Sequence, residues 1–163
     1  MSKSADSKSL LNKIEKLARE RMTAGDVVSF DDLRSLRKKD AARILVVEDD
    51  EIVRKSIQKI LESENYRVVT AEDARELGQV VEEFFFDLII LDVGLPWVNG
   101  YELAEMMKEH EDLQQIPLIF ISGHSDIENI KTGFEVGADD YITMPFEMSV
   151  VKKTVRTLLE LNS

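Results

Sequence analysis

The sequence predicts an α/β protein built on a doubly wound, five-stranded parallel sheet. From residue 43 onward, short continuous apolar runs recur, a pattern typical of strands that are buried on both faces. Each run is followed by apolar residues at helical spacing, so five strands alternate with five helices. This alternation favours parallel βα units with helices on both faces of one sheet. A chain of 163 residues accommodates one such domain and a modest extension.

The expected strands span residues 44–47, 66–70, 88–91, 117–121 and 140–142. A helix with an apolar stripe is expected after each strand, and the Met106–Met107 pair is expected to fill the core. The five stripes comprise, in order, Val53, Ile57 and Leu61; Leu77, Val80, Val81 and Phe84; Leu103, Met106, Met107 and His110; Ile127, Ile130 and Phe134; and Met148, Val151, Val155 and Leu158.

Residues 1–42 do not follow this alternation and are predicted to form a helical N-terminal extension to a domain at residues 43–161. An amphipathic helix is expected to end near Gly25, and a second short helix is expected to begin near Ser29. The apolar pattern is too short for a coiled coil. We expect residues 9–39 to dock on the domain or on a second copy of the chain, which would give a homodimer.

The charge is distributed unevenly along the chain. Residues 1–43 hold 11 Lys/Arg against 7 Asp/Glu, whereas residues 44–163 hold 10 against 25, a net charge of −15. So acidic a domain disfavours direct binding of nucleic acid. The absence of cysteine excludes disulfides and thiolate metal sites. With no apolar run of about 18 residues and no apolar signal-peptide core, we expect no membrane contact and a cytoplasmic location.

Carboxylates collect where the expected strands end. Glu48, Asp49 and Asp50 follow the first strand, Asp92 follows the third, and Ser122 ends the fourth. Because ligands of open α/β sheets bind at the carboxyl ends of the strands, these side chains are expected to meet at one edge. Asp50 is expected to be only a helix N-cap.

Such converging carboxylates suit Mg²⁺, a hard cation that keeps some of its waters for a phosphate group. One carboxylate can then act as a nucleophile toward phosphorus, and the Ser122 hydroxyl can donate to the transferred group. In the metal-free protein, like charges at Glu48, Asp49 and Asp92 are expected to raise at least one carboxyl pKa. Mg²⁺ or the substitution Asp92→Asn should then stabilise the fold at neutral pH.

In combination, these motifs resemble the receiver domain of bacterial two-component response regulators. The resemblance covers residues 43–161 and rests on Val46-Val47-Glu48-Asp49-Asp50, Leu91-Asp92 with Leu95-Pro96 and Gly100, Ile121-Ser122-Gly123, and Gly137-Ala138-Asp139-Asp140-Tyr141-Ile142-Thr143. It implies a flavodoxin-like sheet with strand order 2-1-3-4-5.

The resemblance also implies a role for each site residue. Asp92 aligns with the phosphoacceptor, and Glu48 and Asp49 with the Mg²⁺-binding acid pair. A further metal ligand is implied at the backbone carbonyl of Gly94, while Ser122 and Tyr141 align with the switch residues. The implied partners are a histidine kinase or phosphotransfer protein, or a small phosphoryl donor, and a downstream target that binds the face formed by the fourth helix and fifth strand.

Met144 departs from the family, which carries a lysine at this position. A unit charge pair about 4 Å apart is worth on the order of 4 kcal/mol at an effective dielectric near 20, before desolvation. The chain could therefore be a working phosphoacceptor or a pseudo-receiver that binds partners without phosphorylation. An aspartyl-nucleophile phosphatase is disfavoured, since Gly94 stands where that class carries a second acid. No independent catalytic output is expected.

Overall fold

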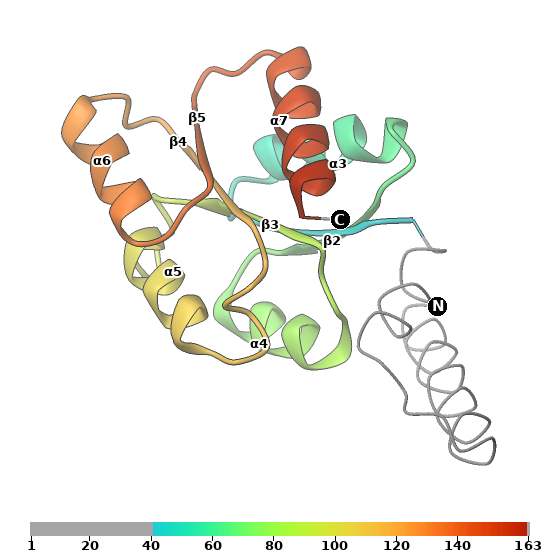
Figure 1. Ribbon diagram of the computed structural model, residues 1–163, viewed down its shortest axis with the longest axis horizontal. Helices are drawn as coiled ribbons and strands as arrows, with labels where there is room; N and C mark the ends of the chain where they lie inside the picture. The colour runs from blue at the N-terminus through green and yellow to red at the C-terminus, as the bar shows by residue number, and fades with distance from the viewer. Residues whose placement is uncertain (1–40, 163) are drawn as a thin grey trace.

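The computed structural model describes residues 41–162, in which strands and helices alternate from Arg43 to Leu161 (Figure 1). The strands are β1 (Arg43–Val47), β2 (Arg67–Ala71), β3 (Leu88–Asp92), β4 (Leu118–Ser122) and β5 (Asp140–Thr143). The helices are α3 (Glu51–Ser63), α4 (Ala74–Glu83), α5 (Gly100–Glu109), α6 (Ile127–Glu135) and α7 (Met148–Leu161). The predicted alternation of five strands and five helices is confirmed.

The strands form one sheet in the order β2-β1-β3-β4-β5, and every neighbouring pair is parallel. The predicted fold class and strand order are therefore confirmed. The chain moves outward from β1 to β2 and then returns to β3 on the other side of β1. The carboxyl ends of β1 and β3 consequently lie at the point where strand order reverses, where such sheets bind their ligands.

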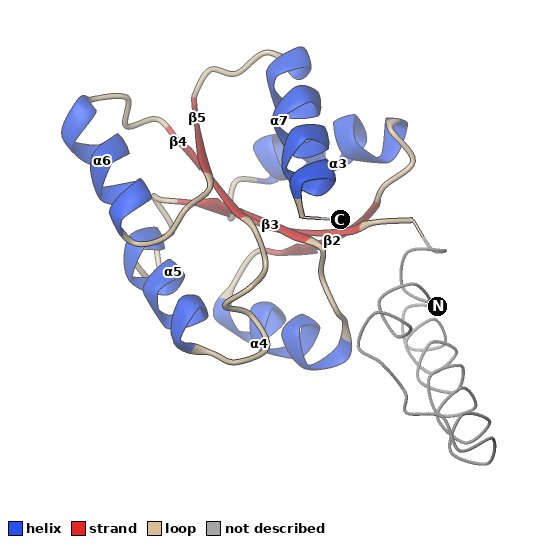
Figure 2. Ribbon diagram, in the orientation of Figure 1, coloured by secondary structure: helices blue, strands red, loops and turns tan. Residues whose placement is uncertain are grey.

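Helices cover both faces of the sheet (Figure 2). Helices α3 and α7 pack on one face, where their buried residues form one apolar cluster with the strands. On the other face, the core is closed by residues of α4, α5 and the segments that follow them. Within β1, Ile44 and Val46 belong to the first cluster, and Leu45 and Val47 to the second. Burial on both faces explains the uninterrupted apolar run in the sequence.

Several stripe residues are more exposed than predicted. Met106 was expected in the core but is 61% exposed, because α5 turns Leu103, Ala104 and Met107 inward and leaves Met106 beside that face. The core prediction was therefore wrong for Met106 and right for Met107. Four other stripe residues are also exposed, namely His110, Ile127, Phe134 and Met148.

The predicted N-terminal extension lies almost entirely outside the described residues, as does the contact expected through residues 9–39. Across residues 41–162, no helix combines the length and apolar character needed to cross a membrane.

Candidate functional site

Three carboxylates meet at the carboxyl ends of β1 and β3. Glu48 and Asp49 directly follow β1, Asp92 ends β3, and the pairing of Val47 with Leu91 sets the two strand ends side by side. One carboxylate oxygen from each of the three residues lies within 4.8 Å of the other two. Glu48 is buried, Asp92 is partly buried and Asp49 is exposed, so the cluster opens to solvent on one side.

Local hydrogen bonds order the acidic loop, residues 48–50, that connects β1 to α3. Asp50 caps α3, because its side chain accepts from the N–H groups of Ile52 at 2.9 Å and Val53 at 3.1 Å. The cap role predicted for Asp50 is therefore confirmed. The backbone N–H of Asp50 also donates to Glu48 Oε1 at 3.0 Å, which fixes the buried carboxyl group.

Burial and neighbouring charge raise carboxyl pKa values in the cluster. Burial, reinforced by the nearby Asp92 charge, raises the pKa of Glu48 from 4.5 to about 8 despite the hydrogen bond from Asp50. Burial also raises the pKa of Asp92, although the hydrogen bond from Gly94 acts in the opposite direction. The expectation that at least one pKa is raised is confirmed, with burial as a larger cause than like charge.

The donor set fits a magnesium ion. All three groups offer hard carboxylate oxygens, and the 4.8 Å limit on their separation is close to the roughly 4.2 Å between opposite ligands at Mg–O distances of about 2.1 Å. A divalent cation would also offset the repulsion that accompanies the raised pKa values. The predicted metal ligands Glu48, Asp49 and Asp92 are thus brought together.

The backbone after β3 approaches Asp92 closely. The N–H of Gly94 donates to Asp92 Oδ1 at 3.1 Å, which orients the carboxylate. A Cβ atom on Gly100 would lie 2.5 Å from the carbonyl oxygen of Asp92, so the first turn of α5 can pack here only with glycine. The metal-ligand role of the Gly94 carbonyl stays a prediction.

Ser122 and Tyr141 are connected through one residue of the β4–α6 loop. Ser122 is 1% exposed, and its Oγ accepts from the N–H of His124 at 2.9 Å. The hydroxyl of Tyr141 donates to the carbonyl oxygen of His124 at 2.9 Å. The two residues expected to act as switches therefore both bond to the backbone of His124, Ser122 at its N–H and Tyr141 at its carbonyl oxygen. Asp92 lies on the neighbouring strand, β3, which pairs with β4.

A second tyrosine joins this network. The hydroxyl of Tyr101 on α5 lies 3.1 Å from that of Tyr141 and donates to the carbonyl oxygen of Asn129 on α6 at 3.0 Å. Both rings pack against Phe120. A Cβ atom on Gly133 would lie 2.8 Å from the Tyr141 ring, so the absence of a side chain there leaves space for the ring.

Met144 follows β5 and is held through its backbone. Its N–H donates to the carbonyl oxygen of Ser122 at 2.8 Å, and its half-buried side chain packs against the apolar cluster under α3 and α7. Within residues 41–162, no lysine or arginine forms an ion pair with Glu48, Asp49 or Asp92. As the sequence indicates, the residue that follows β5, Met144, supplies no positive charge to the three carboxylates.

Two residues of the site, Arg54 and Tyr101, carried little or no signal in the sequence. Arg54 occupies an ordinary surface-type position on α3, and Tyr101 follows Gly100 at the start of α5. The hydroxyl of Tyr101 contacts residues 28 and 40 positions away in the sequence. The guanidinium of Arg54 pairs with Glu72, which lies in a different loop. Only the position of Tyr101 beside a motif glycine could have drawn attention to it.

The chain is similar to known signalling proteins across this domain. Residues 44–156 match the family described as the response regulator receiver domain. The aerobic respiration control protein ArcA of Escherichia coli K12 is 37% identical over 116 residues, covering 71% of this chain and 48% of ArcA. The regulatory protein VanRB of Enterococcus faecalis is 36% identical over 117 residues, covering 72% of this chain and 52% of VanRB. The matched region thus spans about half the length of these relatives.

Solved structures of similar fold are also receiver domains or response regulators. A CheY-like receiver domain protein from Methanospirillum hungatei has a TM-score of 0.69 and 31% identity, covering 76% of this chain and 97% of that one. The BeF3-activated DrrB receiver domain has a TM-score of 0.67 and 34% identity, covering 74% and 98%. The chemotaxis response regulator CheY4 of Vibrio cholerae has a TM-score of 0.68 and 27% identity, covering 72% and 98%.

Proposed function

Because this chain belongs to the response regulator receiver domain family, we propose that Asp92 accepts a phosphoryl group in a Mg²⁺-dependent reaction. The observation that carries the proposal is the convergence of Glu48, Asp49 and Asp92, whose oxygen atoms lie within 4.8 Å of one another. The donor is a histidine kinase, a phosphotransfer protein or a small phosphorylated molecule. In each case a carboxylate oxygen of Asp92 forms a new bond to phosphorus.

The residues around Asp92 divide the remaining tasks. Glu48, Asp49, Asp92 and the Gly94 carbonyl would hold Mg²⁺, which supplies positive charge to the phosphoryl oxygens. Gly94 orients the attacking carboxylate through its N–H. As the new P–O bond forms, the donor's bond to phosphorus breaks and the donor leaves with the electron pair. The Ser122 hydroxyl can then donate to a phosphoryl oxygen.

We propose that the signal leaves through α6, β5 and the start of α7. Ser122 and Tyr141 both bond to His124, so a rearrangement at Ser122 would be transmitted to Tyr141. Ile127 and Phe134 on α6 and Met148 on α7 are large apolar side chains exposed to solvent. A protein target that covers these side chains would sense the position of Tyr141.

A pseudo-receiver is the second candidate, because Met144 is neutral where the family carries a lysine. In this case the domain binds its partners in one conformation, whether or not Asp92 is phosphorylated. Contact through residues 9–39, either with the domain or with a second copy, remains part of both proposals. Comparing the solution mass of the full chain with that of a chain starting at residue 41 tests this contact.

Phosphoryl acceptance can be tested by intact mass after incubation with Mg²⁺ and acetyl phosphate. We expect the protein to gain one phosphoryl group and Asp92→Asn to gain none. Asp50→Asn is the matched control, because it removes a carboxylate from the same loop while asparagine still caps α3. An adduct that persists in Asp92→Asn would contradict the assignment of Asp92. An adduct seen only in Met144→Lys would favour the pseudo-receiver.

A further inference from the structure

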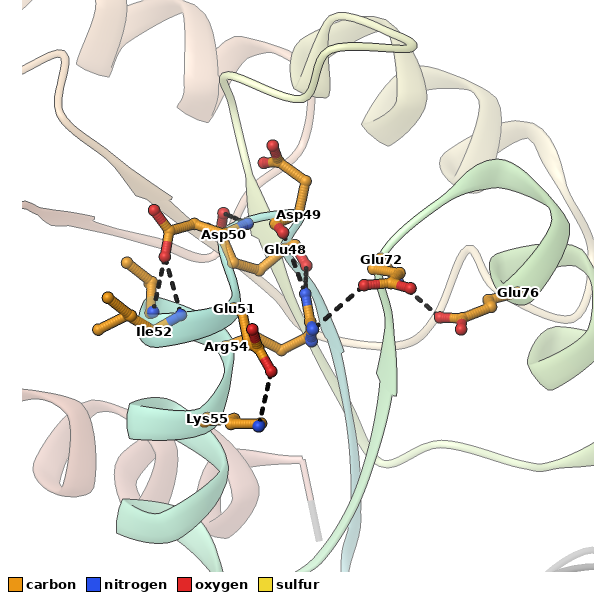
Figure 3. Close-up of polar contacts among 10 residues, drawn as sticks. Glu48, Asp49, Asp50, Glu51, Ile52, Arg54, Lys55, Glu72 and Glu76 are labelled. Carbon is orange, nitrogen blue, oxygen red and sulfur yellow. Dashed lines mark hydrogen bonds and ion pairs between the residues drawn. The ribbon is translucent and has the colours of Figure 1, made fainter.

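We propose that Arg54 is a positioning residue for the metal-binding acid pair. The inference rests on the proposed function, since it concerns the same Mg²⁺ site. Figure 3 shows the Arg54 guanidinium beneath the loop that carries Glu48 and Asp49, with Glu72 on its other side. The role follows from what the guanidinium contacts at each end.

One end of the guanidinium holds the backbone of the acid pair. Nη1 of Arg54 donates to the carbonyl oxygen of Glu48 at 3.0 Å and to that of Asp49 at 3.1 Å. These carbonyls belong to two consecutive residues whose side chains both face the metal site. Fixing both peptide planes therefore limits the directions in which the two carboxylates can project.

The other end is anchored to a second loop. Nη2 of Arg54 pairs with a Glu72 carboxylate oxygen at 3.2 Å, in the connection between β2 and α4. Glu72 is itself held, because its backbone N–H donates to Glu76 Oε2 at 2.9 Å (Figure 3). The N–H of Glu76 in turn donates to Asp73, the N-cap of α4. The guanidinium thus connects the acidic loop to a capped helix.

This geometry distinguishes Arg54 from a substitute for the family's lysine. Its side chain is only 12% exposed, and its guanidinium contacts two backbone carbonyl oxygens and the Glu72 carboxylate. The positive charge is therefore not paired with the Glu48, Asp49 or Asp92 carboxylates. A planar guanidinium can serve two carbonyls and a carboxylate together, whereas a lysine ammonium is a compact donor on a flexible chain.

The expected consequence is weaker Mg²⁺ binding when Arg54 is replaced. Outer groups that orient metal ligands typically contribute 10- to 100-fold to metal affinity. Since Arg54 acts through the backbone of its two ligands, we expect Arg54→Met to weaken binding about tenfold, near the lower end of that range. Arg54→Lys retains the charge but not the planar group, so it should recover only part of the loss.

The experiment is a Mg²⁺ titration of the full chain, followed by Trp97 fluorescence at a temperature well below unfolding. Trp97 lies in the β3–α5 loop, five positions after Asp92, and the described residues include no other tryptophan. Lys55→Met is the matched control. It makes the same charge change one position along α3, where Lys55 is 64% exposed and pairs with Glu51 at 2.7 Å. We expect Lys55→Met to bind Mg²⁺ as the unmodified protein does.

Each outcome decides the inference. A folded Arg54→Met that binds Mg²⁺ with unchanged affinity would overturn it, as would equal weakening in Lys55→Met. If Arg54→Met does not fold, Arg54→Lys and Glu72→Gln take its place, and unchanged affinity in both would have the same meaning. If the unmodified protein does not bind Mg²⁺, the proposed function fails and the inference fails with it. Binding that weakens only in the Arg54 and Glu72 variants would support both.

Discussion

The rim of the sheet has two halves that differ in chemistry. At the ends of β1 and β3, three carboxylates converge, and burial raises the pKa of Glu48 and of Asp92. At the ends of β4 and β5, the site residues are a buried hydroxyl, Ser122, and a half-buried thioether, Met144. We call these the metal half and the switch half.

The chemical difference between the two halves separates two tasks of a receiver domain, accepting a phosphoryl group and transmitting the resulting change to a partner surface. The metal half contains the three carboxylates proposed as ligands, one of which, Asp92, is the candidate nucleophile; hydrogen bonds from Asp50 and Gly94 hold Glu48 and Asp92. The switch half retains Ser122 and Tyr141 but has no charge at Met144. Phosphoryl acceptance and its transmission to α6 and β5 can therefore be impaired to different extents. The predictions that follow test how independent the two halves are.

Met144→Lys should have the largest effect, because it restores the missing charge in the switch half. The pair with Asp92 is worth on the order of 4 kcal/mol before desolvation, and even about half of that exceeds a tenfold change. We expect the initial rate of adduct formation with acetyl phosphate to rise more than tenfold. The measurement is a time course of intact mass at fixed Mg²⁺.

Met148→Lys is the control for this substitution. It adds the same charge four positions along the chain, where the side chain is 55% exposed at the start of α7. A similar rate increase in Met148→Lys would mean that net charge, rather than charge beside Asp92, limits the reaction. No change in Met144→Lys would mean that the metal half alone determines the rate.

The next largest effect should come from pH. As pH rises, the titration of Glu48 in the metal half should lower the stability of the metal-free protein. The folded pKa of Glu48, about 8, lies above its ordinary value of 4.5, so the folded chain binds this proton more tightly than the unfolded chain. The resulting stabilisation is complete below about pH 4.5 and is lost as pH rises through about 8. A pKa difference of one corresponds to about 1.4 kcal/mol, or roughly 5 °C in Tm for a domain of this size.

We therefore expect Tm to fall by several degrees between pH 5 and pH 8 in metal-free buffer, and Glu48→Gln to remove most of that fall. Mg²⁺ or Asp92→Asn should raise Tm at pH 8, because each reduces repulsion within the cluster. Glu51→Gln is the control, since Lys55 lowers the pKa of Glu51 and its titration lies below this range. A flat pH profile in the unmodified protein would contradict the assignment of the raised pKa to Glu48.

Sequence patterns sufficed for the framework of both halves. Apolar runs such as Ile44–Val47 mark strands buried on two faces, and acids directly after strands have to meet at one edge of a parallel sheet. Periodicity could not place Met106, since a stripe's edge depends on how the helix is rotated against its neighbours. Arg54 and Tyr101 could not be found either. Their contacts are with backbone carbonyls and with side chains of other elements, which leave no local pattern.

The smallest effect concerns the tyrosine pair of the switch half. Each hydroxyl has one proton, and Tyr101 and Tyr141 each have a carbonyl acceptor, on Asn129 and His124 respectively. The hydroxyls also lie 3.1 Å apart, where either can donate to the other, so the two residues belong to one hydrogen-bond network. Tyr101→Phe and Tyr141→Phe should then each cost about 1 kcal/mol of unfolding free energy, and the costs should not add in the double variant, because residues in one network are coupled.

Urea unfolding of the two single variants and the double variant measures this coupling. Costs that add to within about 0.5 kcal/mol would mean that the two hydroxyls act independently, each through its own carbonyl. The same preparations test whether the halves are independent. The Tyr101 hydroxyl bonds to Asn129 on α6 and contacts Tyr141 on β5, not the carboxylates of the metal half, so Tyr101→Phe should leave Mg²⁺ affinity within about twofold. A larger loss would show that the tyrosine network extends to the carboxylates, and that the absence of a lysine at position 144 has not separated metal binding from the switch.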